Sequence, residues 1–139
     1  MKDKIDILYV EDNEDYISFV KRAISKIDDK VQLQAVTDGN AALDFFKQEN
    51  DTRSLKLILM DINLPGITGI ELVKKIRQKE GMEFTPIIMF STSDNPADVK
   101  KSYDSGANAY VVKPIGISPL VNSLKSMCDF WLGCNYTKN

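Results

Sequence analysis

The sequence predicts an α/β domain in which five parallel strands form one sheet with helices on both faces. Short apolar segments alternate five times with longer segments whose apolar residues have helical spacing, and this alternation is typical of strand–helix units with parallel strands. The chain has 139 residues, of which 43% are hydrophobic and 27% are charged. These values are those of one soluble globular domain, and they exclude a disordered or collagen-like chain.

The first expected strand covers residues 5–10 (IDILYV), and it ends abruptly at the polar segment 11–13 (EDN). A helix follows over residues 16–27, because its apolar side chains recur at helical spacing with basic residues on the other side. Residues 31–37 (VQLQAVT) alternate between apolar and polar types. This alternation predicts a half-buried strand at an edge of the sheet.

The middle of the chain repeats the pattern. A turn at residues 38–40 (DGN) begins a helix whose apolar face comes from residues 41–46. The third strand, residues 55–60 (LKLILM), ends at Asp61. A loop rich in turn-forming residues follows, and Thr68 near its end is suited to cap the next helix.

The fourth expected strand, residues 86–90 (PIIMF), is followed by the hydroxyl-rich segment 91–93 (STS). Asn95–Pro96 is a good N-cap and first-turn pair for a helix that we expect to stop near Gly106. The fifth strand, residues 109–112 (AYVV), ends at Lys113–Pro114.

The last helix is expected to start at Ser118–Pro119, and its apolar stripe extends to Phe130 and Trp131. Two interpretations of these aromatic residues stay open: they complete the core of the domain, or they form an interface with a partner or a second copy. We expect a domain over residues 1–132 and a polar C-terminal tail over residues 133–139.

Composition excludes several classes of function. The 18 Lys and Arg residues against 20 Asp and Glu residues give a net charge of −2, without the basic excess of a general nucleic-acid binder. The absence of histidine excludes His-based triads, His metal sites and a role as a phosphohistidine donor. Cys128 and Cys134 have no metal-ligand spacing and are interpreted as reduced thiols. No signal peptide or membrane-spanning run is present, so we expect a cytoplasmic protein with no membrane partner.

Reactive or ion-binding residues follow four of the five expected strands. They are Glu11 and Asp12, Asp61, Ser91, and Lys113. Parallel sheets bind ligands beyond the carboxyl ends of their strands, where three carboxylates would repel one another without a cation. Mg²⁺ suits such oxygen ligands and recruits phosphoryl groups, so the set indicates phosphoryl transfer to or from a carboxylate.

Each of these residues also has a purely structural interpretation. The acidic pair and Asp61 could cap turns or helices, the segment 91–93 could form a turn, and Lys113 could be a surface lysine. Their joint placement at the ends of separate strands favours the functional interpretation. The basic end of the third helix is interpreted as a solvated face favoured by the helix dipole; its residues are Lys74, Lys75, Arg77 and Lys79.

The whole chain resembles the receiver domain of two-component response regulators, the family that includes the chemotaxis receiver. Four segments carry the resemblance: LYVED (8–12), MDINLPGITG (60–69), PIIMFSTS (86–93) and SGANAYVVKP (105–114). The C-terminal part resembles, more weakly, the single-domain receivers that accompany bacterial phytochromes. The resemblance implies a flavodoxin-like sheet with strand order 2-1-3-4-5.

The resemblance also implies roles for the acidic residues. Asp61 would be the aspartate that accepts the phosphoryl group. Glu11 and Asp12 would hold Mg²⁺ together with Asp61, with Asp12 in the more direct contact. Asn63 would offer its backbone carbonyl to the metal.

Ser91 and Lys113 would contact the phosphoryl group, and Tyr110 would be the switch aromatic that moves with Ser91. Tyr110 precedes Lys113 by three positions, so we expect the two side chains on opposite faces of the sheet. An alternative is that Tyr110 only fills the core. The resemblance further implies a cis Lys113–Pro114 peptide bond. Thr68 departs from the family, which often has Asp or Asn there, but it affects helix capping only.

The implied function is that of a stand-alone receiver and not of an enzyme with an external substrate, since it catalyses only its own aspartyl phosphorylation and dephosphorylation. A sensor histidine kinase or a phosphotransfer protein would supply the phosphoryl group. Output would pass to a downstream protein, or to a second copy, through the fourth helix, fifth strand and fifth helix. No DNA-binding segment is expected.

Two other classes stay open at the level of sequence. One is a flavodoxin-like nucleotide or flavin carrier, although the acidic segment 11–15 (EDNED) lacks the glycine and hydroxyl donors that hold a phosphate. The other is a Mg²⁺-dependent aspartyl phosphohydrolase. Such enzymes usually carry a second Asp as general acid two places after the nucleophile, where this chain has Asn63.

Overall fold

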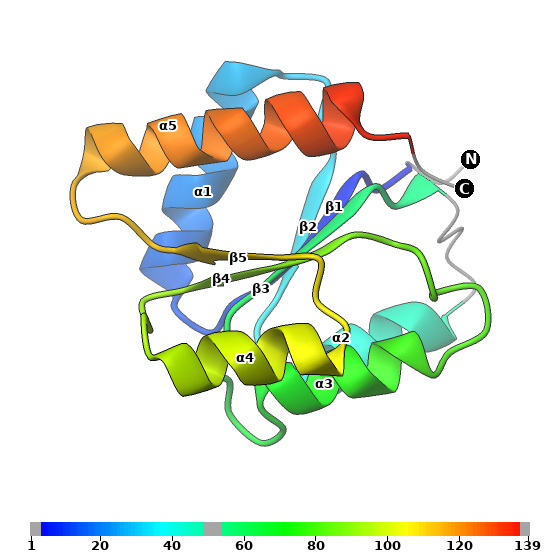
Figure 1. The fold of residues 1–139 in the computed structure, drawn as a ribbon. Coiled ribbons are helices and arrows are strands. Elements are labelled where there is room, and N and C mark those ends of the chain that lie inside the picture. The colour runs from blue at the N-terminus through cyan, green and yellow to red at the C-terminus, as the bar shows by residue number, and fades with distance from the viewer. Residues whose placement is uncertain (1–3, 49–53, 137–139) are drawn as a thin grey trace.

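The computed structural model describes residues 4–48 and 54–136. Within them, five parallel strands form one sheet in the order β2-β1-β3-β4-β5, as the sequence predicts. Helices α1 and α5 cover one face of this sheet, and α2, α3 and α4 cover the other (Figure 1). The strands are β1 (Ile7–Val10), β2 (Leu33–Val36), β3 (Leu57–Met60), β4 (Ile87–Ser91) and β5 (Ala109–Val112). The helices are α1 (Glu14–Ile27), α2 (Gly39–Lys47), α3 (Gly69–Arg77), α4 (Pro96–Ser105) and α5 (Ile117–Met127).

The three inner strands carry the core. Every residue of β1, β3 and β4 is buried, whereas β2 is only partly buried, as expected for the edge strand. Alternate residues of the inner strands enter two apolar layers, one on the side of α1 and α5 and one on the side of α2 and α3. Both layers are built from hydrophobic side chains, and the buried polar residues Glu11, Asp61, Ser91 and Lys113 lie at the carboxyl ends of the strands.

Local capping explains where four helices begin. The side chains of Asn13, Asp38, Thr68 and Asn95 each accept a backbone N–H of the first helical turn that they precede. Gly106, with a φ of +118°, ends α4 in the left-handed conformation. The expected start of the last helix was wrong by one residue: α5 begins at Ile117, after Gly116, without a side-chain cap.

The C-terminal helix runs past the expected start of the polar tail. A π-helical segment, η2 (Cys128–Cys134), continues α5, and its Trp131 packs against the layer formed with α1 and α5. Phe130 lies beside Trp131 in an edge-to-face contact but is 50% exposed. Trp131 therefore contributes to the core, whereas Phe130 is available to solvent. In the part of the chain that the structure describes, no helix has the length and apolar character to cross a bilayer.

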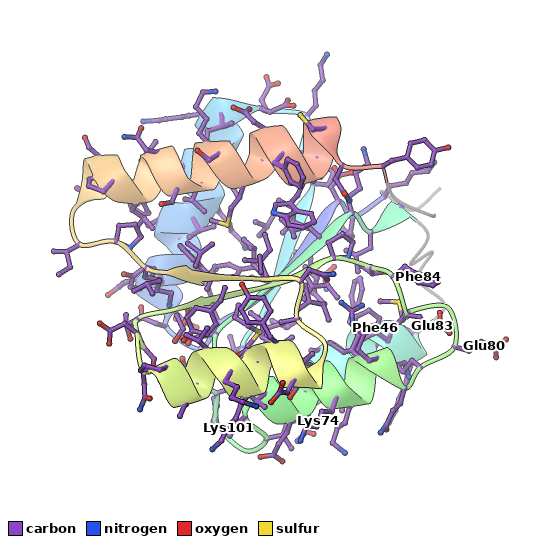
Figure 2. All side chains as sticks on the ribbon, viewed as in Figure 1. Phe46, Lys74, Glu80, Glu83, Phe84 and Lys101 are labelled. Atoms are coloured by element: carbon purple, nitrogen blue, oxygen red, sulfur yellow. The ribbon has the colours of Figure 1, made fainter. Side chains whose placement is uncertain are left out.

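The basic end of α3 is not uniformly solvated, so that prediction was wrong for Arg77. Lys74 and Lys75 are exposed, and Figure 2 shows Lys74 at the outer edge of the layer formed by α3 and α4. Arg77 instead donates hydrogen bonds to the carbonyl oxygens of Gly106, Met82 and Thr85 and to Asn108 Oδ1, at 2.7–3.0 Å. Its guanidinium thereby connects the loop between α3 and β4 with the loop between α4 and β5 at the amino end of the sheet, because its fork of donors can serve several acceptors at once.

Candidate functional site

An acidic site lies at the carboxyl ends of β1 and β3. Val10 of β1 pairs with Met60 of β3, so Glu11 and Asp12 follow one strand beside Asp61, which follows the other. Carboxylate oxygens of these three residues lie within 4.8 Å of one another. The structure thus brings together the three carboxylates that the sequence analysis singled out.

The three carboxylates differ in exposure. Glu11 is 1% exposed and Asp61 is 8% exposed, whereas Asp12 faces solvent. Burial raises the pKa of Glu11, and its hydrogen bond with Lys113 offsets only part of that effect. Asp61 Oδ1 accepts the backbone N–H of Asn63 at 3.3 Å, which fixes the start of the loop after β3.

Lys113 connects this acidic site to the far edge of the sheet. Its backbone N–H bonds to the Ser91 carbonyl at 2.7 Å, and its Nζ donates to Glu11 Oε1 and to Asp61 Oδ2, the latter at 3.2 Å. The Tyr16 ring lies 4.2 Å from Nζ, within cation–π distance. Burial alone would lower the pKa of Lys113, but Glu11 and Asp61 outweigh it, so the pKa is raised.

The Lys113–Pro114 peptide bond is trans, so the prediction of a cis bond was wrong. The trans form is the ordinary state of an X–Pro bond, favoured by roughly 0.5–1 kcal/mol. Lys113 reaches both carboxylates with this bond trans, so its approach to Asp61 does not need a cis turn.

Ser91 and Tyr110 are linked through Ser93. Ser91 is the last residue of β4 and is fully buried, and its Oγ accepts the Ser93 N–H at 3.3 Å. The Tyr110 hydroxyl donates to the Ser93 carbonyl at 2.8 Å, and Ser93 Oγ donates to Asp98 of α4 at 2.7 Å. Tyr110 packs on the layer of α2 and α3, opposite the side on which Lys113 meets Tyr16, as the period of two predicts.

Sequence reasoning missed two aromatic residues of the site. Tyr16, in the first turn of α1, covers the Lys113 ammonium, and Tyr9, in β1, donates from its hydroxyl to Glu11 Oε1 at 3.2 Å. The signal for Tyr9 was present, because it precedes Glu11 by two positions and a strand places such residues on one face. For Tyr16, no pattern within one helix indicates a partner at the end of β5.

The donor set fits a hard divalent cation. Three carboxylates with no histidine or thiol among them match the oxygen ligands that Mg²⁺ and similar ions use. The neighbouring ammonium and hydroxyl groups, from Lys113 and Ser91, suit a phosphoryl group attached to a carboxylate. The arrangement can therefore hold a cation and stabilise an added phosphoryl group at the same edge of the sheet.

Comparison with known proteins agrees with this geometry. The model of the response regulator receiver domain matches residues 7–125. The probable methanogenesis regulatory protein FilR2 of Methanothrix harundinacea is 30% identical over 96% of this chain and 88% of its own length. The response regulator Rcp1 of Synechocystis is 32% identical over 91% of this chain and 88% of its own length.

Solved structures of two response regulators have the same fold. The phosphorylated cyanobacterial phytochrome response regulator RcpA aligns with a TM-score of 0.88 and 29% identity, over 99% of this chain and 100% of that one. The Mn²⁺-bound form of Rcp1 aligns with a TM-score of 0.82 and 30% identity over the same shares. Family model, relatives and fold agree: this chain belongs to the response regulator receiver domains of two-component systems.

Proposed function

We propose that Asp61 accepts a phosphoryl group from the phosphohistidine of a sensor histidine kinase or a phosphotransfer protein. The observation that carries this proposal is the meeting of three carboxylates with the Lys113 ammonium beyond the ends of β1, β3 and β5. Receiver domains are signalling proteins and not classical enzymes. The only chemistry proposed for this chain is therefore at its own aspartate.

In the proposed reaction, a carboxylate oxygen of Asp61 attacks the phosphorus and the bond from phosphorus to the donor's imidazole nitrogen breaks. An acyl phosphate forms on Asp61, and the donor keeps the electron pair of the broken bond. Lys113 already donates to Asp61 Oδ2, so it orients the carboxylate and offsets charge on the phosphoryl oxygens. The buried Ser91 hydroxyl, at the end of the neighbouring strand, would donate to one of those oxygens.

Receiver domains bind a divalent metal at an acidic pocket, and we propose Mg²⁺ for this chain. Asp12 and Asp61 would hold the ion, and the Asn63 backbone carbonyl would be a further oxygen donor. Glu11 would lie next to the ion. When bound, the ion supplies positive charge that offsets the repulsion between the carboxylates and the phosphoryl oxygens. That the similar protein Rcp1 has a Mn²⁺-bound form supports the binding of a divalent ion by this chain.

Output is proposed to pass through α4, β5 and α5. Phosphorylation would draw Ser91 toward Asp61, and the hydrogen bond between Tyr110 and the Ser93 carbonyl would carry this movement to β5 and α4. The recipient would be a downstream protein in the cytoplasm, or a second copy of the chain. Exposed apolar side chains on this side, among them Tyr103 and Val112, support a protein partner.

The test is incubation with acetyl phosphate and Mg²⁺, followed by intact mass spectrometry. Wild-type protein and the control Asp104→Asn, a change on exposed α4, should gain one phosphoryl group, whereas Asp61→Asn should gain none. The assignment of Asp61 as the phosphoryl acceptor would be overturned if Asp61→Asn became phosphorylated or if the wild type did not. Continuous hydrolysis of an external phosphate ester would favour an aspartyl phosphohydrolase instead.

A further inference from the structure

Tyr9 is a core residue whose hydroxyl group reaches the acidic site. The side chain is fully buried in the layer between the sheet and α1 and α5, and the three other residues of β1 are apolar. Its hydroxyl donates to Glu11 Oε1 at 3.2 Å. An apolar side chain would fill this strand position without that hydroxyl, so the role of the hydroxyl lies at Glu11.

Both oxygens of the Glu11 carboxylate are already engaged. Oε1 accepts from the Tyr9 hydroxyl and from Lys113 Nζ, and Oε2 accepts the Asn13 backbone N–H at 3.2 Å. Glu11 is also 1% exposed, whereas its neighbour Asp12 faces solvent. The acidic pair is thus divided into one carboxylate fixed by protein donors and one that is open to an incoming ion.

The hydroxyl acts on Glu11 in two ways. It fixes the carboxylate in the rotamer that meets Lys113, since a tyrosine packed in a core has little freedom of its own. It also occupies one lone pair of Oε1, and Lys113 Nζ occupies the other. A divalent ion could therefore contact Oε1 only by displacing the hydroxyl or the ammonium.

We propose that Tyr9 is a positioning residue that keeps the Glu11 carboxylate on Lys113 and withholds it from a bound divalent cation. The inference rests on the proposed ion site and assigns different roles to its three carboxylates. Asp12 and Asp61 take the cation, while Glu11 holds the ammonium that serves the phosphoryl group. The site therefore binds a divalent ion less tightly than its three carboxylates would allow.

The experiment is a calorimetric titration of Mg²⁺ and of Mn²⁺ into wild type, Tyr9→Phe and Tyr136→Phe. Tyr9→Phe removes only the hydroxyl, and we expect it to bind both ions about threefold or more tightly, because Glu11 regains a free lone pair. Tyr136 is 97% exposed, so its variant should match wild type. A purely structural role of the hydroxyl would loosen the site and weaken binding, so equal or weaker binding by folded Tyr9→Phe overturns the proposal.

A second measurement uses the wild type and does not depend on whether Tyr9→Phe folds. The Lys113 ammonium signal, assigned by its absence from Lys113→Met, is followed by ¹⁵N NMR as Mg²⁺ is added. We expect the ammonium signal to persist when Mg²⁺ is saturating, because Glu11 stays hydrogen-bonded to Lys113. Disappearance of the signal through proton exchange with water would overturn the proposal. If Tyr9→Phe binds the ions with the affinity of wild type, only the role of Tyr9 is refuted. If no variant shows saturable binding, the ion site and the role of Tyr9 are refuted together.

Discussion

Lys113 and Glu11 stand 102 positions apart in the chain, and their side chains form an ion pair that is only 3% and 2% exposed. They belong to the ends of β5 and β1, which β3 and β4 separate in the sheet. Taking both charges out of water is costly, and the pair persists because Asp61, Tyr9 and the Asn13 N–H share the hydrogen bonding. This pair therefore joins the first and last strands at the edge where the phosphoryl group is proposed to arrive.

Replacing Lys113 by methionine should destabilise the fold, because Glu11 and Asp61 would be left buried beside each other without a cation. The expected loss is about 3–5 kcal/mol in urea unfolding with a chelator present. Added Mg²⁺ should restore more stability to Lys113→Met than it adds to wild type. Lys100→Met is the control, since Lys100 pairs with Asp104 on the exposed side of α4 and should change stability little. A variant as stable as wild type would contradict the importance of the pair.

Cys128 should make stability depend on pH in the alkaline range. Burial, with the nearby charges of Asp129 and Asp28, raises the pKa of this thiol from its ordinary value of 9.0 to about 11. A raised folded-state pKa contributes stability that is fully present below pH 9 and is lost as the pH rises through about 11. The difference in unfolding free energy between wild type and Cys128→Ala should therefore shrink by about 2 kcal/mol over that range.

The exposed Cys134 provides the matched control for this titration. Cys134→Ala should leave the pH dependence of stability as it is in wild type. At neutral pH, iodoacetamide should modify Cys134 quickly and Cys128 only at the rate of protein opening. Equal rates at both thiols would show that Cys128 is not protected.

Arg77 should be a major contributor to stability although it stands at the basic end of a surface helix. Arg77→Leu leaves three carbonyl oxygens without their side-chain donor and removes one of the two donors to Asn108 Oδ1, and we expect a loss of about 2–4 kcal/mol in urea unfolding. Arg77→Lys should recover little of it, because one ammonium cannot reproduce the planar fork. Lys75→Ala, on the exposed face of the same helix, should stay within about 0.5 kcal/mol of wild type.

The parts of the fold that depend on local sequence could be predicted. Asp38, Thr68 and Asn95 cap helices because a short polar side chain can reach the free N–H groups of the next turn. The meeting of the Glu11–Asp12 pair with Asp61 followed from one general property, that parallel strands end at the same edge of a sheet. The strand order came from the resemblance to receivers and was confirmed.

The remaining features depend on contacts between distant segments. Arg77 was predicted to be solvated because basic residues at the end of a surface helix suit the helix dipole. Its acceptors, three backbone carbonyls and the Asn108 side chain, lie in loops, and no residue pattern marks them. The trans bond before Pro114 could not be decided by sequence, since cis and trans differ little in energy there. The helix continues to Cys134 because Trp131 packs on the layer of α1 and α5, whereas the composition of residues 133–139 indicated only a polar tail.

The output surface can be tested with the neighbouring pair Phe130 and Trp131, which differ in exposure although their rings are 4.9 Å apart. If a second copy of the chain is the partner, light scattering should show a monomer that dimerises when beryllofluoride and Mg²⁺ imitate phosphorylation. Phe130→Ser should then weaken the dimer about tenfold, because exposed aromatic side chains supply much of the energy of such interfaces, and it should leave unfolding in urea nearly unchanged. Trp131→Ala should act the other way and lower the stability of the monomer by about 2–3 kcal/mol, since it removes part of the apolar layer. A monomer under both conditions, with Trp131→Ala still costing stability, would assign both aromatics to the domain itself and leave a foreign protein as the recipient of the signal.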